Sequence, residues 1–548
     1  WQGVIVGEWD GTAAGPHIDY DDRHTAVEGF SNTNGGRHAT HVAGTVLGAG
    51  IIDPEATGMA PEATLFSWNF GGIITNEMDT GAARYGVEIT QNSYSYSTAF
   101  DRCTRRSSYD ANSRAIDLLV NKYPYLLHVY AAGNSRRSNC LPGGYGTVAS
   151  GYQAGKNTLV VAAVTRTDGN SSFHAYGPMK DGRLKPEISA VGVNVNSTFP
   201  YNNYQSGYSG TSMACPGTSG SGALLYEQYE TMVGDRPPSH LIKNLLCNGA
   251  EDLGRPGPDF QYGFGRVNVW NSARILEEGR YKVDDVSQNG VFADTLRLRR
   301  GTGRFKLMLC WDDPAAASNA SVSLVNDLDL ILIDPNGDTI RPWVCDPTNY
   351  TRNARRLRDN LNNIEQITLD NPSYTVYIAQ VLGRRVTGSQ QSFSLSWMSR
   401  DTGLQITYPN GGENWMPPSN SGSAQIIRWD VFGLGGLGLL EYSIDSGQNW
   451  NVISNTVDLA RGYYDWRTCP SNTRSGKVLI RISQSTYTDQ SDGVFSIFPQ
   501  MASPSAVVCD SQVHLKWNAL TGAVGYRVWM NIDGGMTPLD TTPMSFSL

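Results

Sequence analysis

The chain has 548 residues and a mass of 59.7 kDa, which is too long for one hydrophobic core and predicts three to five domains. A formal net charge of −8 and an isoelectric point near 5.6 argue against nucleic acid as the main partner, because phosphate binding needs a basic face. No apolar run reaches the roughly 18 residues of a transmembrane helix, and we expect any export signal to lie outside this chain.

Up to about residue 275, short apolar runs alternate with helical patterns. The apolar runs are GVIVGEWD, ATLFSW, LLHVYAAGN and NTLVVAAV, and the helical patterns are MDTGAARYGV, SRAIDLLVNKY and SGSGALLYEQYETMV. Because each crossover between parallel strands needs a helix, this alternation predicts an α/β domain with a parallel sheet and helices on both faces.

From residue 285 the helical patterns stop and short strand patterns broken by turns take their place. These patterns are LRLRRGTGRFKLMLCW, DLDLILIDPNGDTI, SYTVYIAQVL and SFSLSWMS. They predict all-β sandwich domains. A further strand-rich unit opens at TGLQITYPNGGENW, and VHLKWNALTGAVGYRVWMN looks like the first strands of another sandwich.

Two polar residues lie at the ends of elements in the α/β region. Asp10 ends the strand GVIVGEWD, at the carboxyl edge where open α/β sheets build their sites, although a turn or cap residue is the alternative. His38 begins a helix in GGRHATHVAGT, where an imidazole can exchange protons near neutral pH. The alternative is that His38 and His41 are both structural, and a metal pair is disfavoured because HExxH spacing is absent.

Asn134 and Ser212 are the other two candidates. Asn134 ends LLHVYAAGN, where its side-chain amide can point at an oxyanion above the sheet edge, unless it is a simple turn residue. Ser212 lies at a helix start in GYSGTSMACPGTSGSGALL, where a helix cap without chemistry is the alternative. G-x-S-x-G is absent from the chain, which excludes the nucleophile elbow of an α/β-hydrolase.

The four candidates occur along the chain in the order Asp, His, Asn, Ser. This order indicates a family far more specifically than any one of the residues does. Residues 1 to about 275 resemble the catalytic domain of the subtilisin-like serine proteases, the subtilases, through WDGT, HATHVAGT, AAGNS and GTSMACP. The resemblance implies that Ser212 is the nucleophile, that His38 is the general base and that Asp10 orients the imidazole. It also implies that the Asn134 amide and the Ser212 N–H bind the oxyanion, and that catalysis requires no cofactor.

The same resemblance places a specificity pocket between two segments. One wall is Ser93, Tyr94 and Ser95, and the other is Ala131, Ala132 and Gly133. The chain departs from the family at Ala39 and Ser95, where Gly is usual, and we expect Ser95 to narrow the pocket. The segments TAFDRCTRRSSYD and SRRSNCLPGGYG are predicted to form a disulfide-tied rim whose arginines favour acidic substrate residues, unless they are solvated loops.

Eight cysteines are scattered along the chain without CxxC spacing, at positions 103, 140, 215, 247, 310, 345, 469 and 509. This pattern disfavours zinc ribbons and thioredoxin-like motifs and suits local disulfides in an oxidising compartment. Cys103 with Cys140 is the favoured pair, because both lie in polar, turn-rich segments. For Cys215 and Cys247, in apolar helical surroundings, free buried thiols are the alternative.

Four regions are expected. They are a peptidase domain (1–278), a region resembling the jelly-roll β-barrel of some large subtilases (285–400), a region resembling immunoglobulin-like modules (402–498) and a region resembling a partial fibronectin type III domain (503–548). Structural calcium is predicted in the second region, with turn-forming roles as the alternative. The candidate calcium ligands are Asp312, Asn326, Asp327 and Asp329, with Asp359 and Asn363.

The sequence therefore predicts a secreted or cell-surface serine endopeptidase that acts on protein or peptide substrates. Its β domains are expected to provide stability, surface attachment or substrate capture. The alternatives are a binding or structural protein with a silent protease domain, and a dedicated processing protease for one partner. The chain begins nine residues before Asp10, so we expect either a processed mature form or a portion of a longer precursor.

Overall fold

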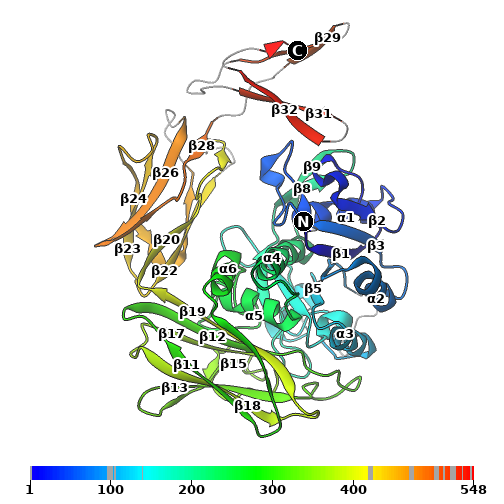
Figure 1. The fold of residues 1–548 in the computed structure, drawn as a ribbon, viewed down its shortest axis with the longest axis vertical. Coiled ribbons are helices and arrows are strands. Elements are labelled where there is room, and N and C mark those ends of the chain that lie inside the picture. Colours follow the sequence, from blue (N-terminus) through cyan, green and yellow to red (C-terminus); the bar gives the residue numbers. More distant parts are fainter. Residues whose placement is uncertain are drawn as a thin grey trace. The chain divides into compact units, whose positions relative to one another are not determined.

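The computed structural model describes residues 3–95, 103, 106–138, 140–417, 424–467, 474–498, 505–509, 512–518, 526–532, 535–542 and 546–547. It divides the chain into two compact units, each described by itself below (Figure 1). The first unit is Trp1–Arg300 with Phe305–Ser399, and the second is Gly301–Arg304 with Arg400–Leu548.

A seven-stranded parallel sheet forms the centre of the first unit, in the order β2-β3-β1-β4-β5-β6-β7. Its strands are β1 (Ile5–Asp10), β2 (His24–Ala26), β3 (Thr64–Asn69), β4 (Ile89–Asn92), β5 (Leu127–Ala131), β6 (Leu159–Val164) and β7 (Ile188–Val191). Every residue of β4, β5 and β6 is buried, as expected of parallel strands that are covered on both faces.

Helices cover both faces of this sheet, as Figure 1 shows. They are α1 (Asn34–Leu47), α2 (Ile74–Tyr85), α3 (Ala111–Lys122), α4 (Thr211–Val233), α5 (Ser239–Gly249) and α6 (Val269–Glu277). Alternate residues of β1 belong to two cores: Val6 packs in the cluster of α1, α4, α5 and α6, and Trp9 in the cluster of α2 and α3. The predicted α/β architecture is confirmed. None of the helices among the described residues is long and apolar enough to cross a membrane.

After α6 the first unit continues as a sandwich of two antiparallel sheets, β10-β19-β12-β17 and β11-β18-β13-β14. The strands are β10 (Tyr281–Val286), β11 (Val291–Arg297), β12 (Thr302–Cys310), β13 (Asp327–Ile333), β14 (Thr339–Ile340), β17 (Ile364–Asp370), β18 (Val376–Arg385) and β19 (Gln391–Asp401). A short hairpin, β15 (Trp343–Val344) with β16 (Arg355–Arg356), carries a loop at residues 345–354. The core between the sheets includes Phe305, Trp311 and Phe393.

Helix α5 joins the sandwich to the α/β region. Every residue of α5 is buried, so this helix has no solvent-facing side. The side-chain amide of Asn244 donates hydrogen bonds to the backbone oxygens of Met308 (3.0 Å) and Ser394 (2.9 Å) in the sandwich. One turn later the Asn248 amide donates to the Ser396 oxygen at 3.1 Å. The sandwich therefore completes the core of the α/β region.

Buried charged side chains lie near the contact between α5 and the sandwich. Lys185 and Lys243 both contact the Glu187 carboxylate, with N–O distances of 2.5 and 2.9 Å. Lys156 forms a fully buried ion pair with Asp313 of the sandwich. Because a buried charge without a partner is costly, the Lys156–Asp313 pair ties the two regions together in one arrangement.

The second unit contains two further sheets, β20-β22-β25 and β21-β28-β26-β23-β24, with β27 paired to β26. The strands are β20 (Gly403–Tyr408), β21 (Asn414–Trp415), β22 (Gln425–Phe432), β23 (Leu437–Ser443), β24 (Asn451–Asp458), β25 (Tyr463–Trp466), β26 (Ser475–Gln484), β27 (Tyr487–Gln490) and β28 (Phe495–Ile497). The two sheets enclose Trp415, Trp429 and Trp466, which supports the predicted sandwich class.

The last strands are β29 (Ser505–Cys509), β30 (Gln512–Lys516), β31 (Tyr526–Ile532), β32 (Gly535–Thr542) and β33 (Phe546–Ser547). Two small antiparallel sheets contain them, β29-β30-β33 and β31-β32. Parts of the predicted fibronectin-like region (503–548) lie outside the described residues.

The cysteines follow the predicted disulfide pattern only in part. Cys103 and Cys140 form a disulfide, which confirms the favoured pair. Cys215, Cys247, Cys310 and Cys345 are free thiols, so the expected local disulfides in these segments are wrong and the alternative of free buried thiols holds for the first two. Cys469 and the side chain of Cys509 lie outside the described residues.

Candidate active site

Asp10 and His38 come together at the carboxyl edge of the sheet. Asp10 is the last residue of β1, and His38 lies in the first turns of α1, which Thr33 caps by accepting a hydrogen bond from Gly36 N–H. Nδ1 of His38 lies 2.9 and 2.8 Å from the two Asp10 carboxylate oxygens. A carboxylate can only accept, so Nδ1 carries the proton and Nε2 of the neutral ring is left as a base.

Two glycines allow this close approach of strand and helix. A Cβ atom on Gly11 would lie only 2.8 Å from the Cα atom of Gly35, so any larger residue would push the end of β1 away from α1. The Asp10 side chain is 4% exposed and the His38 side chain 28%. The carboxylate is therefore shielded from water, whereas the ring still reaches solvent.

The electrostatics of His38 result from two opposing effects. Burial alone would lower the pKa of His38, but the negative charge of Asp10 and its hydrogen bond outweigh burial and raise that pKa. His41 behaves differently: burial lowers its pKa to about 4, and its ring stacks on Tyr208 with centroids 4.7 Å apart. His41 is thus a neutral core residue.

Ser212 lies in the first turn of α4 and is held by Ser93. The Ser212 hydroxyl donates to the Ser93 carbonyl at 2.9 Å, and the Ser93 hydroxyl donates to the Ser212 carbonyl at 2.7 Å. Pro216, four residues after Ser212, has no N–H, so the Ser212 carbonyl lacks its usual helical donor. Ser93 replaces that donor. Among the described residues, no hydrogen bond joins the Ser212 hydroxyl to the His38 ring.

The Asn134 side chain is oriented by the residue before Ser212. Its Oδ1 accepts from the backbone N–H and from the hydroxyl of Thr211, both at 3.0 Å. Its Nδ2 therefore turns toward Gly210, where it would lie 3.5 Å from a Cβ atom. The neighbouring Gly133, at φ +100°, donates its N–H to the same Thr211 hydroxyl at 3.2 Å. The amide N–H₂ and the Ser212 N–H at the start of α4 can together bind an anion.

The two predicted walls of the specificity pocket are joined by Gln153. Its side-chain amide donates to the Tyr94 carbonyl at 2.7 Å and to the Ala131 carbonyl at 3.4 Å. Ser93 and Ala132 are buried, whereas Tyr94 and Ser95 are partly exposed. The narrowing expected from Ser95 stays a prediction, and most of the predicted rim TAFDRCTRRSSYD lies outside the described residues.

Gln153 and Thr211 are parts of this site that no motif predicted. Thr211 is adjacent to a candidate residue, so its place at a helix start was a usable signal. Gln153 lies in an irregular segment and contacts residues 59 and 22 positions away, and no local pattern marks it.

The residues proposed for calcium are engaged in other contacts. Arg358 contacts Asp327 and Asp329, with N–O distances of 2.6 and 2.9 Å, and Arg384 contacts Asp329 at 2.6 Å. Asp312 accepts from Ser239 at 2.8 Å. The Asn326 oxygen accepts from Thr387, and its amide donates to Gln391. Asp359 caps the turn at Leu361, and the Asn363 amide donates to the Trp311 carbonyl.

Guanidinium groups thus neutralise Asp327 and Asp329, and the other four residues make hydrogen bonds within the protein. These contacts compete with a cation for the same oxygens, and structural calcium stays a prediction. Within the described ranges, no group of three or more His, Cys, Asp or Glu residues is arranged to hold a metal ion.

The comparison with known proteins decides the family. The sequence profile of the Subtilase family matches residues 13–265. Subtilisin DY of Bacillus licheniformis is 31% identical over 281 residues, which cover 50% of this chain and 91% of that protein. The chain belongs to the subtilase family. This subtilase is accordingly a serine endopeptidase, and therefore a hydrolase.

Other known proteins also align with about half of this subtilase. Bacillopeptidase F of Bacillus subtilis (strain 168) is 27% identical over 302 residues, which cover 50% of this chain but only 19% of that protein. Subtilisin NAT of Bacillus subtilis subsp. natto is 30% identical over 270 residues, covering 47% of this chain and 62% of its own length. The solved structure of prenylagaramide maturation protease PagA aligns with a TM-score of 0.40 and 22% identity, over 50% of this chain and 94% of that one.

Proposed function

We propose that this subtilase is a secreted endopeptidase that cleaves protein or peptide substrates with Asp10, His38 and Ser212. The observation that carries the proposal is the contact of His38 Nδ1 with the shielded Asp10 carboxylate at 2.8 Å. This contact fixes the tautomer in which Nε2 accepts a proton, and it stabilises the imidazolium that results.

Catalysis requires the Ser212 hydroxyl to change partners. In the resting arrangement it donates to the Ser93 carbonyl, so a rotation about its Cα–Cβ bond must bring it to His38 Nε2. His38 then takes the hydroxyl proton while Oγ attacks the scissile carbonyl, and the same proton passes to the leaving amine as the peptide bond breaks. The Asn134 amide and the Ser212 N–H stabilise the oxyanion of the tetrahedral intermediate.

Replacing Ser212 with Ala tests the proposal directly. The variant keeps the fold, because the Ser212 backbone contacts remain, and we expect kcat on a casein-type substrate to fall about 10⁶-fold. A fluorophosphonate should label wild-type protein at Ser212 and leave Ser212→Ala unlabelled. Unchanged hydrolysis by the variant would sink the proposal.

The same labelling separates an active protease from a binding protein with a silent protease domain. Folded wild-type protein that resists the fluorophosphonate would favour the silent domain. A peptide library then distinguishes a broad degrading enzyme from a processing protease for one partner, since only the second would cut one sequence context.

Two further features belong to the proposal. The Cys103–Cys140 disulfide supports secretion or a cell-surface location, because such bonds persist in oxidising compartments. The β-sandwich after α6 is proposed to stabilise the peptidase region through α5. Cell-surface attachment or substrate capture by the second unit stays a prediction.

A further inference from the structure

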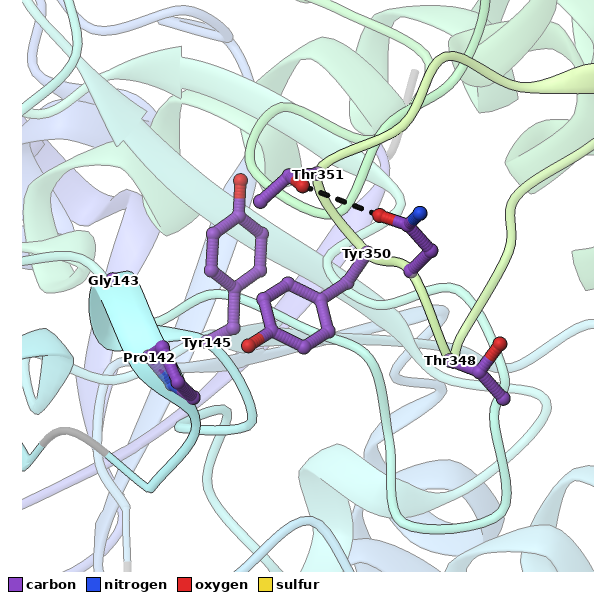
Figure 2. A pocket seen from close by; sticks show the side chains of 7 residues that line it. Pro142, Gly143, Tyr145, Thr348, Tyr350 and Thr351 are labelled. Atoms are coloured by element: carbon purple, nitrogen blue, oxygen red, sulfur yellow. Dashed lines mark hydrogen bonds between the residues drawn. The ribbon is translucent and has the colours of Figure 1, made fainter.

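The loop at residues 345–354 carries a tyrosine from the sandwich onto the peptidase region. The ring of Tyr350 packs against Tyr145, with centroids 4.5 Å apart and planes at 38° (Figure 2). A pocket of 440 Å³ opens beside the two rings and is also lined by Pro142, Gly143 and Thr348. Tyr350 is half-buried, whereas Tyr145 is only 3% exposed.

Tyr145 is held from two further directions. Its hydroxyl accepts hydrogen bonds from Gln261 at 2.7 Å and from Arg255 at 3.1 Å. Its ring packs against the fully buried Tyr176, with centroids 5.1 Å apart. Tyr145 therefore transmits the position of Tyr350 to the segment that ends at Tyr176.

That segment, residues 171–176, holds the chain on both sides of Asn134. Ala175 N–H donates to the Gly133 carbonyl at 2.9 Å, and Arg136 N–H donates to the Phe173 carbonyl at 3.1 Å. The Arg136 guanidinium also lies over the Tyr176 ring, 4.5 Å from its centroid. Asn134 thus lies in a short loop whose two ends are both fixed to the segment that Tyr145 supports.

We propose that Tyr350, supplied by the sandwich, is a positioning residue for the oxyanion-binding amide of Asn134. This inference rests on the proposed function, and it makes the sandwich part of the catalytic apparatus rather than only a stabiliser. The ring of Tyr350 fixes Tyr145, Tyr145 fixes residues 171–176, and these residues fix the loop of Asn134. An oxyanion donor must be aligned to within a fraction of an ångström, so loss of the Tyr350 ring should reduce transition-state binding.

Steady-state kinetics of Tyr350 variants test this inference. Tyr350→Ala should lower kcat about tenfold, less than the 10²–10³-fold cost of removing an oxyanion donor, and should change KM less than about twofold. Affinity for a peptide boronic acid, which forms a tetrahedral adduct with Ser212, should fall in parallel with kcat. Tyr350→Phe should behave as wild type, because the inference uses the ring and not the hydroxyl. If Tyr350→Ala does not fold, Tyr350→Leu takes its place.

A double-mutant cycle shows whether Tyr350 acts through Asn134. In an Asn134→Ala background, Tyr350→Ala should lower kcat less than about twofold, because the amide that it positions is already gone. Tyr374→Ala is the matched control, since it removes a tyrosine ring that contacts Tyr377 elsewhere in the sandwich and should leave kcat unchanged.

Equal losses in both backgrounds, a rise in KM alone, or impairment of Tyr350→Phe would each overturn the inference. Failure of the proposed function would look different, because Ser212→Ala would then retain activity whatever residue stands at position 350.

Discussion

Pro216 removes a backbone donor from the helix that presents Ser212, and Ser93 compensates with its side chain. The Ser93 hydroxyl also accepts a hydrogen bond from Gln91 at 2.7 Å, and Ser219 donates to the Gln91 oxygen at 3.0 Å. These side chains connect the end of β4 to α4 at Ser212 and again at Ser219. The Ser212 backbone is therefore fixed through its carbonyl, and a rotation of the side chain about the Cα–Cβ bond leaves that contact intact.

Ser93→Ala should therefore impair both stability and catalysis. The Ser212 carbonyl and the Gln91 amide would lose their partners, which costs about 1–3 kcal/mol in the free energy of unfolding. The first turn of α4 would also move, so we expect kcat to fall. Urea denaturation and steady-state kinetics measure the two effects. Ser95→Ala, two residues away and partly exposed, is the control, and equal stability of both variants would contradict this account.

The contact of Asp10 with His38 predicts the pH dependence of activity. His38 must be neutral to accept the proton, so kcat/KM should fall as the pH drops through a His38 pKa above 6.5. In Asp10→Asn the charge that raises this pKa is absent and burial still lowers it, so the acidic limb should move to lower pH. The variant should also lose about 10⁴-fold in kcat. A pH–rate profile with an unmoved acidic limb would refute the assignment.

Sequence patterns were informative about these residues to different degrees. The positions of Asp10, His38, Asn134 and Ser212 at element ends were visible in short motifs, because the ends of parallel strands and the starts of helices meet at one sheet edge. The residue that joins the two pocket walls was not visible, because Gln153 reaches the Tyr94 and Ala131 carbonyls only through the fold. The sequence also did not show that Arg358 and Arg384, from later parts of the chain, contact Asp327 and Asp329, and structural calcium stays a prediction.

At the scale of elements, the sequence predicts the strands and helices of the peptidase region. It does not predict the buried ion pairs between them. The runs ATLFSW and NTLVVAAV correspond to β3 and β6, because buried parallel strands are continuous apolar runs. Lys185, Glu187 and Lys243 are ordinary surface residue types in a sequence. Only the packing of α5 against the start of β7 shows that they are fully buried.

The stability of the protein should depend strongly on which residue of this buried ion cluster is replaced. Glu187→Gln leaves two buried lysines without a countercharge and should cost about 3–5 kcal/mol of stability. Lys185→Met should cost only about 1 kcal/mol, because Lys243 still neutralises Glu187 and because burial lowers the pKa of Lys185 to about 7. Thermal denaturation of both variants at pH 7 provides the comparison. A larger loss for Lys185→Met would contradict the assigned pairing.

At the scale of the molecule, the sandwich and the peptidase region share one core. Met308, Cys310, Ile364 and Met398 of the sandwich belong to the same apolar cluster as α1, α4 and α5. Sequence patterns separate the two regions near residue 280, because periodicity changes there. They contain no sign that α5 is buried on every side, since its outer face is covered by strands more than sixty residues later.

Truncation tests this shared core. A chain that ends at residue 279 should expose α5 and aggregate or unfold, because the apolar side chains of this fully buried helix would lose their cover and Asn244 and Asn248 would lose their hydrogen-bond acceptors. A chain that ends at residue 401 keeps the sandwich and should remain folded and active. Circular dichroism measures whether each truncated chain is folded, and casein hydrolysis measures whether it is active. Full activity of the shorter chain would show that the sandwich is dispensable.

The complete burial of α5 has a consequence for the order of events during synthesis. Chains fold from the N-terminus as they leave the ribosome, at about 5–20 residues per second. All the residues proposed for catalysis emerge by position 212, but Met398 is needed to close the core around α5. A competent protease should therefore arise only after nearly two hundred further residues have been made.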